Sequence, residues 1–254
     1  EVINYADWKY YVQDEPVLSD YEYDQLFKKL KHLEEQYPEH VTADSPTQRV
    51  ALGLSEKFPP VAHLVPMLSL DNTYNADDLR DWDRKCRELA GDAKIEYCVE
   101  PKYDGASISL VYEHDQLIRG ATRGDGVVGE EVTTNIKQIK SIPLSATFMK
   151  EHVSQIEIRG EILIHKKVFE EFNQQRLAEG LSPLANPRNA ASGTLRMLDP
   201  REVKKRGLTA ILYQISDYTT TEHSRPKMLH THYDSIKWLY ELGFPTPLKQ
   251  MQVF

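Results

Sequence analysis

The chain has 254 residues, 40% of them apolar, and a formal net charge of −8. This length suffices for one medium-sized domain and a small one, and the negative charge argues against the whole chain being a nucleic-acid clamp. No apolar run approaches the roughly 20 residues of a membrane span, and no signal-peptide start is present. Cys86 and Cys98 lack the spacing of a zinc or disulfide site. We therefore expect a cytoplasmic protein with no membrane partner.

The first fifty residues or so are predicted to form a small, strongly charged helical unit. Ser19 followed by Glu22 has the spacing of a capping box, which predicts that a helix begins there. Asp20, Tyr23 and Asp24 then fall within one turn on neighbouring faces. Acids in a first turn stabilise any helix through its dipole, so by themselves they do not establish a ligand site. The apolar stripe of this helix comprises Tyr23, Leu26, Phe27, Leu30, Leu33 and Tyr37.

A domain junction is predicted between Gly53 and Pro66, where a glycine and three prolines interrupt the pattern. We place the boundary after residue 54, which gives domains of residues 1–54 and 55–254. A helix is predicted near residues 75–90, capped by Asn75 and ended by Gly91. Its apolar stripe, which predicts that Cys86 is a core residue, comprises Leu79, Trp82, Cys86 and Leu89.

The run Glu100-Pro-Lys-Tyr-Asp-Gly105 is the most informative stretch of the chain. If residues 95–104 are extended, alternate residues share a face, so Glu100, Lys102 and Asp104 point together into a polar pocket. A lysine amine is a nucleophile only when deprotonated, and burial or a nearby cation lowers its pKa from the reference value of about 10.4. Pro101 removes a ladder donor, so the strand must be unpaired there or begin a bulge. A surface lysine flanked by ion-pairing acids is the alternative interpretation.

Further strands follow. Ala106–Tyr112, a polar turn and Gln116–Arg123 predict a β-hairpin. Residues 156–164 alternate between isoleucines on one face and Glu157, Arg159 and Glu161 on the other, which predicts one buried face and one charged face at a cleft. These strands, together with helices near residues 75–90 and 165–179, favour an α+β fold with an antiparallel sheet.

Four blocks occur in a specific order: Lys102-Tyr-Asp-Gly, Ala121-Thr-Arg-Gly-Asp-Gly, Arg159-Gly-Glu and Ala185-Asn-Pro-Arg-Asn-Ala-Ala. In this order and spacing the chain resembles the NAD-dependent DNA ligases of bacteria, from about residue 10 to residue 245. The tyrosine- and aspartate-rich N-terminal stretch resembles the small helical domain that only these ligases carry. That stretch argues against the ATP-dependent ligases and mRNA-capping enzymes, which share the lysine motif.

The resemblance implies that Lys102 attacks the α-phosphate of NAD, expels nicotinamide mononucleotide and becomes adenylated. A nicked DNA 5′-phosphate then accepts the AMP. Asp104 would orient the lysine and the ribose, Glu100 would recognise the adenine edge, Glu161 would bind the ribose hydroxyls, and Arg123 would sit near ribose and phosphate and depress the pKa of Lys102. The remaining implied contacts are Tyr213 stacked on adenine, Ser69 and Leu70 on the adenosine side, Tyr10, Tyr11, Asp20, Tyr23 and Asp24 around the nicotinamide ribose and ring, and Arg188 and Arg196 at the nick or the adenylate phosphate.

The implied cofactors are NAD and Mg²⁺, the metal being bound mainly by water and phosphate oxygens. The implied partner is nicked double-stranded DNA in the full-length enzyme, and we expect a monomer. The basic segment from Arg188 to Arg206 is expected to hold DNA phosphates without base specificity, with a solvated basic loop as the alternative for its last three residues.

Two alternatives of other classes remain. Residues 124–129 satisfy G-x-G-x-x-G, the pattern of a dinucleotide-binding dehydrogenase, but such a loop should follow an apolar parallel strand and open a helix. The other alternative is a nucleotide-binding fragment with little catalysis, because ligases of this family continue to an Asp-Gly-hydrophobic-hydrophobic-hydrophobic-Lys strand and a further lysine, and no such motif occurs here. We therefore expect slow self-adenylation and no nick sealing by this chain alone.

Overall fold

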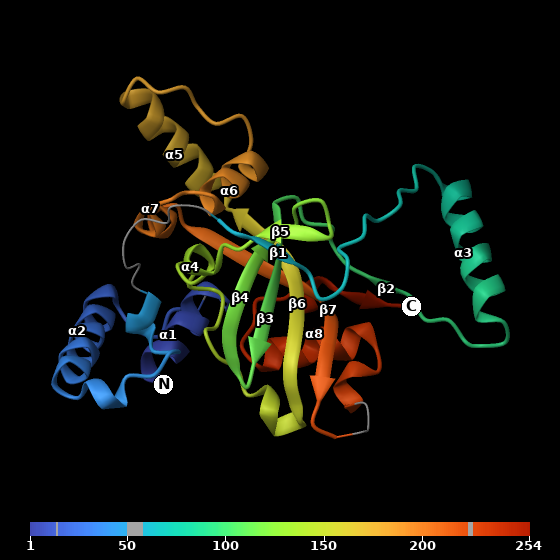
Figure 1. Cartoon of the computed structure of the whole chain (residues 1–254). Helices are drawn as coiled ribbons and strands as arrows, with labels where there is room; N and C mark the ends of the chain where they lie inside the picture. The colour runs from blue at the N-terminus through green and yellow to red at the C-terminus, as the bar shows by residue number, and fades with distance from the viewer. Residues whose placement is uncertain (14, 50–57, 223–225) are drawn as a thin grey trace.

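A computed structural model describes residues 1–13, 15–49, 58–222 and 226–254. Its parts are a small helical unit at the N-terminus and a larger unit built around an antiparallel sheet (Figure 1). The α+β class predicted from the sequence is confirmed. The predicted boundary after residue 54 lies outside the described residues.

The helical unit contains α1 (Val2–Tyr11), α2 (Asp20–Gln36) and the short 3₁₀ turns η1 (Pro38–His40) and η2 (Pro46–Arg49). The capping box at the start of α2 is confirmed. The Ser19 hydroxyl accepts a bond from the Glu22 amide at 3.3 Å, and the Glu22 carboxylate accepts one from the Ser19 amide at 2.9 Å. This exchange satisfies two backbone donors that the helix leaves open and fixes where α2 begins.

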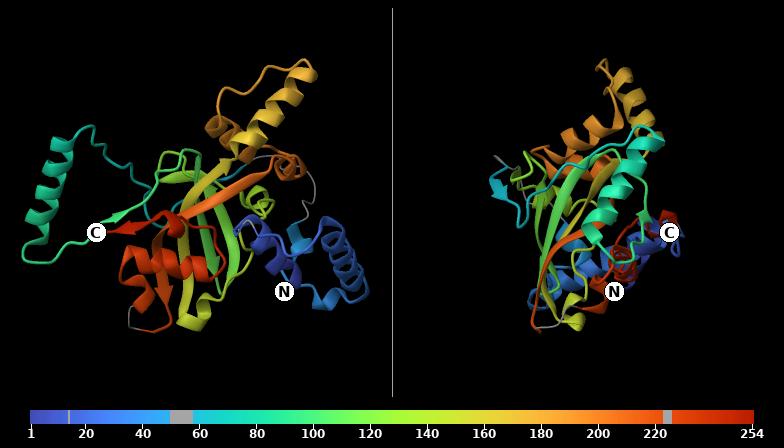
Figure 2. Two further views of the ribbon diagram at one scale, coloured as in Figure 1. Left: turned by 180° about the vertical axis from the view of Figure 1, so that it is seen from behind. Right: turned by 90° about the vertical axis from the view of Figure 1, so that its right-hand side faces the viewer.

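The helical unit is fastened to the larger unit through Arg49. Its guanidinium donates to the backbone carbonyls of Lys137, Ile139 and Ile142 at 3.1, 3.1 and 2.8 Å. The Ser145 hydroxyl adds a 2.6 Å bond to Asp44. These contacts place the helical unit beside the β4 edge of the sheet, on the side away from α3 (Figures 1 and 2).

Four antiparallel strands form the central sheet of the described residues, in the order β4-β3-β6-β7. The predicted hairpin is confirmed as the β3–β4 pair, whose last paired residues are Glu113 and Gln116. Two smaller antiparallel pairs, β1–β5 and β2–β8, flank this sheet. The strands are β1 (Pro60–Ala62), β2 (Cys98–Val99), β3 (Ala106–Glu113), β4 (Gln116–Thr122), β5 (Val128–Glu130), β6 (Val153–Ile164), β7 (Leu208–Thr220) and β8 (Gln252–Val253).

One face of the sheet carries the apolar core. The isoleucines of β6 on this face are fully buried, as predicted, beside Ile108 and Leu110 of β3. Tyr112 packs edge-on against Phe148 and Phe244, with ring centroids 5.4 Å apart in both pairs. Burial of such apolar surface is the main stabilising contribution to the fold. The remaining elements of the larger unit are α4 (Thr133–Ile136), η3 (Phe148–Glu151), α5 (Lys166–Ala178), α6 (Pro187–Leu195), α7 (Pro200–Lys205), η4 (Lys227–Leu229), α8 (His232–Glu241) and η5 (Leu248–Gln250).

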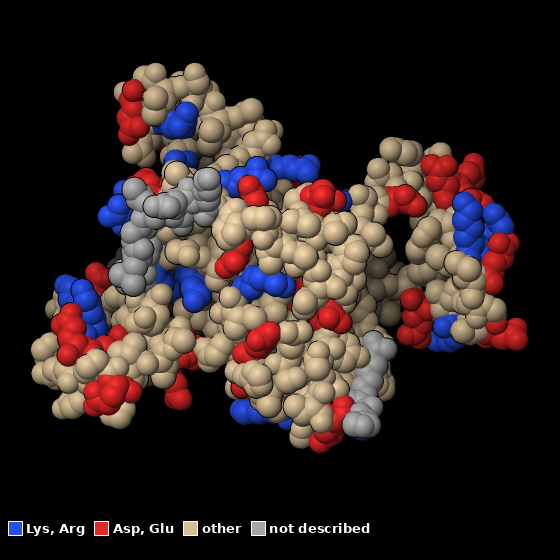
Figure 3. All heavy atoms as spheres, in the orientation of Figure 1, with Lys and Arg blue, Asp and Glu red and all other residues tan. Residues whose placement is uncertain are grey.

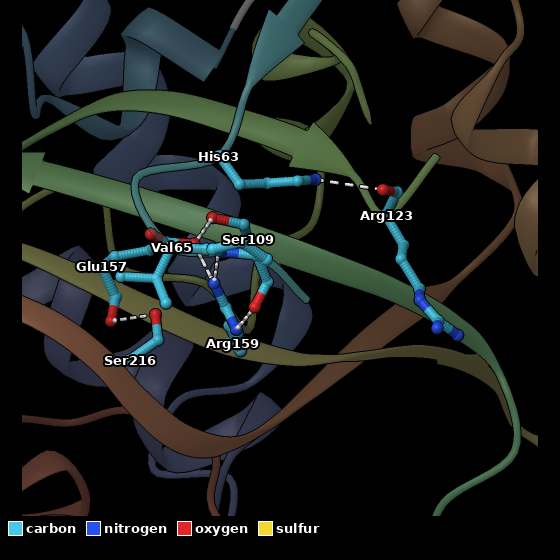
Figure 4. A network of polar contacts seen from close by, with 8 residues as sticks. His63, Val65, Ser109, Arg123, Glu157, Arg159 and Ser216 are labelled. Atoms are coloured by element: carbon cyan, nitrogen blue, oxygen red, sulfur yellow. Dashed lines mark hydrogen bonds and ion pairs between the residues drawn. The ribbon is translucent and has the colours of Figure 1, made fainter. Parts of the chain in front are cut away.

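The second face of β6 is buried too, and here the sequence interpretation is wrong. Glu157, Arg159 and Glu161 were expected on an open charged face, yet they are only 0%, 5% and 6% exposed. The segment that follows β1 crosses this face, and Arg159 donates to the carbonyls of Val65 and, at 3.1 Å, Pro66 (Figure 4). Arg159 and the Ser109 hydroxyl also bond Glu157, at 3.2 and 2.7 Å. The two charges neutralise each other under a loop, so they do not line a cleft.

The expected strand over residues 95–104 is much shorter than predicted. Cys98 and Val99 pair with β8, Tyr97 exchanges backbone hydrogen bonds with Phe254, and the chain is irregular from Glu100 to Asp104. The strand therefore ends just before Pro101, in accord with the missing ladder donor. Beyond it Gly105 passes close to β6, since a Cβ atom there would lie 2.2 Å from the Ile162 carbonyl oxygen.

Helix α3 (Ala76–Ala90) begins at Asn75 and ends at Gly91 as predicted, but it stands away from the sheet (Figure 2). The side chains of Leu79, Trp82 and Leu89 are 53%, 44% and 89% exposed. Cys86 is only half-buried, so its assignment to the core is wrong.

The G-x-G-x-x-G segment forms the turn between β4 and β5. Gly124 and Gly126 have positive φ angles of 57° and 95°, as a tight turn requires. A strand follows the turn instead of a helix, so the dehydrogenase alternative is excluded. Within the described ranges, no helix combines the length and apolar character needed to cross a bilayer.

Candidate active site

Lys102 lies in the irregular segment between β2 and β3, and its side chain is exposed. Its ammonium group acts on the carboxylate of Glu161, where it opposes protonation. Three residues beyond Lys102, the Gly105 amide donates to Glu161 at 3.3 Å, so this segment meets Glu161 although 59 positions of sequence (161 minus 102) separate Lys102 from it. The sheet accounts for this, because Ser107 at the start of β3 pairs with Glu161 in β6.

Glu161 is the organising carboxylate of the site. It accepts hydrogen bonds from the Gly105 amide at 3.3 Å, the Ser107 hydroxyl at 3.0 Å and the Tyr213 hydroxyl at 3.3 Å. Burial raises the pKa of Glu161, while these bonds and the charge of Lys102 act in the opposite direction. Its orientation is thus fixed by β7 and by the start of β3 with the residue before it.

Tyr213 projects from β7 beside Glu161. Burial, followed by the negative charge of Glu161, raises the pKa of the Tyr213 hydroxyl to about 12. The phenol is therefore protonated at neutral pH and donates to Glu161. The structure therefore brings Glu161 and Tyr213 together, while their roles in a nucleotide site stay a prediction.

Arg123 follows the end of β4 and donates to the Ser69 hydroxyl at 2.9 Å. The Arg123 carbonyl lies 3.0 Å from His63 Nε2 (Figure 4). Ser69 and Arg123 were assigned to one nucleotide site from distant blocks of sequence, and they are in contact. Leu70, assigned to the same site, is 76% exposed.

Carboxylates on both sides of Lys102 have side-chain partners from other elements. Glu100 lies 3.3 Å from Nε2 of His232, the first residue of α8. Asp104 forms a 3.2 Å ion pair with Arg188 in α6. Arg196 lies elsewhere, in a 2.6 Å ion pair with Glu130 of β5. His232 is not identified from the sequence, since no local pattern marks a contact between residues 132 positions apart.

A cavity of about 360 Å³ lies between α1, α2 and the residue Lys140 of the larger unit. Tyr10, Tyr23 and Asp24 line it, as the sequence prediction of a ligand site in this unit requires. The side chains of Tyr11 and Asp20 lie outside the described part of the structure. The complete lining is Ala6, Asp7, Tyr10, Pro16, Val17, Leu18, Tyr23, Asp24 and Lys140.

Asp7 and Lys140 were missed by the sequence analysis. A signal for Asp7 exists, because Asp7 shares one face of α1 with the apolar residues Ile3 and Ala6 at helical spacing, and both of these are buried. Lys140 has no comparable signal, because it comes from a turn beyond α4 whose contact with α2 depends on how the two units dock.

The basic segment 188–206 is helical for most of its length, as α6 and α7. Arg201 and Lys205 form ion pairs with neighbouring acids at 2.7 Å. On the face shown in Figure 3, Lys and Arg are interspersed with Asp and Glu. Among the described residues, no three His, Cys, Asp or Glu side chains gather in a metal-binding group.

Comparison with known proteins identifies the family of the chain. The model of the NAD-dependent DNA ligase adenylation domain matches residues 55–253, and that of the DNA ligase-like N-terminal NAD⁺-binding domain matches residues 1–51. DNA ligases of Persephonella marina, Hydrogenobaculum sp. and Aquifex aeolicus are 60%, 57% and 53% identical to this chain over its full length. The chain spans 36%, 36% and 35% of those relatives. Because the adenylation-domain model alone covers most of its residues, the chain belongs to the family of NAD-dependent DNA ligases.

Proposed function

We propose that this chain carries out the nucleotidyl-transfer step of an NAD-dependent DNA ligase. The observation that carries the proposal is the contact of the segment after Lys102 with the Glu161–Tyr213 pair, made through the Gly105 amide, together with a separate aromatic and acidic cavity in the helical unit. The Lys102 amine, once deprotonated, attacks the α-phosphorus of NAD. The bond to the β-phosphate oxygen breaks, nicotinamide mononucleotide leaves, and AMP stays on the lysine nitrogen.

In this proposal the two halves of NAD bind at two places in the chain, the adenosine half around Lys102 and the nicotinamide half in the helical unit. Around Lys102, Glu161 binds the ribose hydroxyls, Tyr213 stacks on adenine, and Glu100 reads the adenine edge. Arg123, next to Ser69, lies on the phosphate side. Cationic donors there stabilise the negative charge that develops on the phosphate oxygens during transfer. Asp104 orients the lysine, and Leu70 completes the adenosine side.

The helical unit takes the nicotinamide half of NAD in this proposal. Tyr10, Tyr23 and Asp24 line its cavity, with Tyr11 and Asp20 as further contacts. Aromatic faces and carboxylates suit a cationic pyridinium ring.

Mg²⁺ would be held mainly by phosphate oxygens and water. The scattered carboxylates of the described residues fit such a loosely held ion better than a dedicated protein cage. Bound there, the ion would neutralise phosphate charge.

Sealing of DNA belongs to the proposal for the longer protein, because the relatives are nearly three times as long as this chain. There the AMP passes to the 5′-phosphate of a nick during replication or repair, with Arg188 and Arg196 near the phosphates. We propose a monomer acting in the cytoplasm, with slow self-adenylation by this chain alone.

Incubation with NAD and, in a separate reaction, with ATP tests the choice of nucleotide. We expect an intact-mass increase equal to one AMP with NAD alone. The increase should disappear when purified nicotinamide mononucleotide is added in excess, since the transfer is reversible. An increase with ATP alone would contradict the proposal.

Replacement of Glu161 with glutamine tests the ribose contact. The amide keeps the shape but loses the charge that accepts hydrogen bonds from Ser107, Tyr213 and the ribose. Hydrogen bonds to a charged group contribute about 1.5–3 kcal/mol, so we expect AMP to bind about 10- to 100-fold more weakly in calorimetric titrations. An unchanged dissociation constant would remove Glu161 from the nucleotide site.

Tyr213→Phe is the matched comparison for the stacking role. It removes the hydroxyl that donates to Glu161 and keeps the ring. We expect this variant to retain most of the AMP affinity, whereas Tyr213→Ala should lose about 1–3 kcal/mol of base stacking. Equal losses in the two variants would show that the hydroxyl matters and the ring does not.

A further inference from the structure

Lys140 brings a positive charge into the cavity of the helical unit, although it belongs to the larger unit. Its ammonium nitrogen lies 4.7 Å from the centre of the Tyr23 ring and 3.3 Å from the Tyr23 hydroxyl. It also lies 3.9 Å from the carboxylate of Asp7. The side chain of Lys140 is 26% exposed, so water screens these interactions only in part.

Asp7 is a buried carboxyl group with a cation, Lys140, beside it. The residue is 5% exposed, and its Oδ1 atom is buried and accepts no hydrogen bond from the described residues. The 3.9 Å ion pair with Lys140 is too long for a hydrogen bond. Burial raises the pKa of Asp7, against which the charge of Lys140 and a hydrogen bond from Tyr23 act. Removal of the cation would leave a buried carboxylate poorly compensated.

A nicotinamide ring bound in this cavity would occupy the position that the Lys140 ammonium group now holds between Tyr23 and Asp7. The ring of NAD is a cation, and a cation gains most over an aromatic face and next to a carboxylate. Tyr23 offers one such face, and Lys140 already stands over its ring; Phe27 is stacked with that ring at 6.3 Å. Ammonium and pyridinium cannot both stand between the same Tyr23 face and Asp7.

We propose that Lys140 is an internal cation that holds the nicotinamide pocket in the absence of ligand, and that the pyridinium ring displaces it from Tyr23 and Asp7. This inference rests on the proposed function, since it concerns how the same pocket is regulated. The exchange keeps the pocket charge constant. It also gives a reason for selecting the oxidised ring, because a neutral dihydronicotinamide cannot compensate Asp7 when Lys140 leaves.

The test uses nicotinamide mononucleotide as the probe, because it reaches this pocket without the adenosine site. Lys140→Met removes the charge and keeps an apolar stem of similar length. We expect the mononucleotide to bind this variant about tenfold more tightly than the parent chain in calorimetric titrations. The reduced, neutral mononucleotide should gain nothing from the substitution.

Two control variants isolate the charge of Lys140. Lys140→Arg keeps a cation at the aromatic ring and should bind the mononucleotide no more tightly than the parent chain. Lys9 also stands over an aromatic ring of the same unit, 5.5 Å from the centre of Trp8, but it does not line the cavity. Lys9→Met should therefore leave the affinity unchanged.

Thermal unfolding supplies a second readout. Without ligand, Lys140→Met should unfold at a lower temperature because Asp7 loses its cation. The mononucleotide should raise the unfolding temperature of this variant more than that of the parent chain. An equal rise in both would overturn the exchange.

Weaker binding of the mononucleotide to Lys140→Met would also overturn it, and would show that Lys140 assists the ligand. Nicotinamide riboside, which lacks the phosphate, identifies the reason, since a loss of affinity confined to the phosphorylated probe means that Lys140 holds the phosphate.

Failure of the proposed function gives a different set of results. In that case the parent chain and Lys140→Met both fail to bind the mononucleotide, and Tyr23→Ala changes nothing. If the exchange alone is wrong, the parent chain binds, Tyr23→Ala abolishes binding, and Lys140→Met brings no gain.

Discussion

Lys102→Ala is expected to abolish the covalent AMP adduct while nucleotide binding persists. The amine of Lys102 is the proposed nucleophile, and loss of a nucleophile commonly reduces turnover by about 10⁴-fold or more. Binding should survive because Glu161, Tyr213 and Arg123 are held by contacts that do not involve Lys102. Intact-mass spectrometry after incubation with NAD measures the adduct, and calorimetry with AMP measures affinity.

Two further lysine variants sharpen this test. Lys102→Arg keeps a positive charge beside Glu161 but offers no nucleophilic amine, so it should also form no adduct. Lys94 is an exposed lysine before β2, 2.9 Å from Glu96, and Lys94→Ala should be adenylated like the parent chain. An AMP adduct that persists in Lys102→Ala and maps to another residue would refute the assignment.

The largest effect on stability is expected from Arg159→Met. This change leaves Glu157, which is completely buried, without its cation, and breaking a buried pair by removing one partner costs about 3–5 kcal/mol. The carbonyls of Val65 and Pro66 lose their donor as well. Urea unfolding should therefore show a much lower midpoint with an unchanged dependence on denaturant.

A double variant separates the charge from the packing. Glu157→Gln combined with Arg159→Met removes both charges, so it should recover part of the lost stability. Arg196→Met serves as the surface comparison, because Arg196 pairs with Glu130 at 2.6 Å while both side chains are substantially exposed. Exposed pairs contribute about 0–1 kcal/mol. If Arg159→Met cost no more than Arg196→Met, the buried pair would have no structural importance.

Arg159 also connects stability with the site. The segment whose carbonyls it binds continues to Ser69, which bonds Arg123. Arg159→Met is therefore expected to loosen the Ser69–Arg123 contact and to weaken AMP binding even at temperatures where the chain stays folded.

Local rules predicted the local structure well. The capping box at Ser19 and the Asn75 cap of α3 depend on bonds within three residues, and both form as expected. The β3–β4 hairpin likewise depends on a short turn between two alternating runs. The resemblance assigned Ser69, Arg123, Glu161 and Tyr213 to one site, and the structure brings Ser69 to Arg123 and Glu161 to Tyr213. That these two pairs form one site with Lys102 stays a prediction.

Tertiary contacts account for what the sequence did not predict. The alternation in β6 showed two faces but could not show that the segment after β1 covers the charged one. The apolar stripe of α3 has the pattern of a core-facing helix, yet periodicity alone does not say what a helix packs against. Lys140 and His232 were missed for the same reason, since their partners come from other elements of the fold.

The docking of Arg49 has a consequence for how the two units tolerate mutation. Its guanidinium binds main-chain oxygens of residues 137, 139 and 142, and every amino acid supplies such an oxygen. Substitutions in the receiving turn can therefore accumulate without loss of the attachment, provided the backbone path stays the same. Position 49, which supplies the donor, has no such freedom, because a lysine there would lack the planar guanidinium group that reaches three acceptors. Substitutions across this junction should accordingly be distributed unequally. The turn on the sheet side should tolerate many side chains, whereas position 49 of the helical unit should tolerate few.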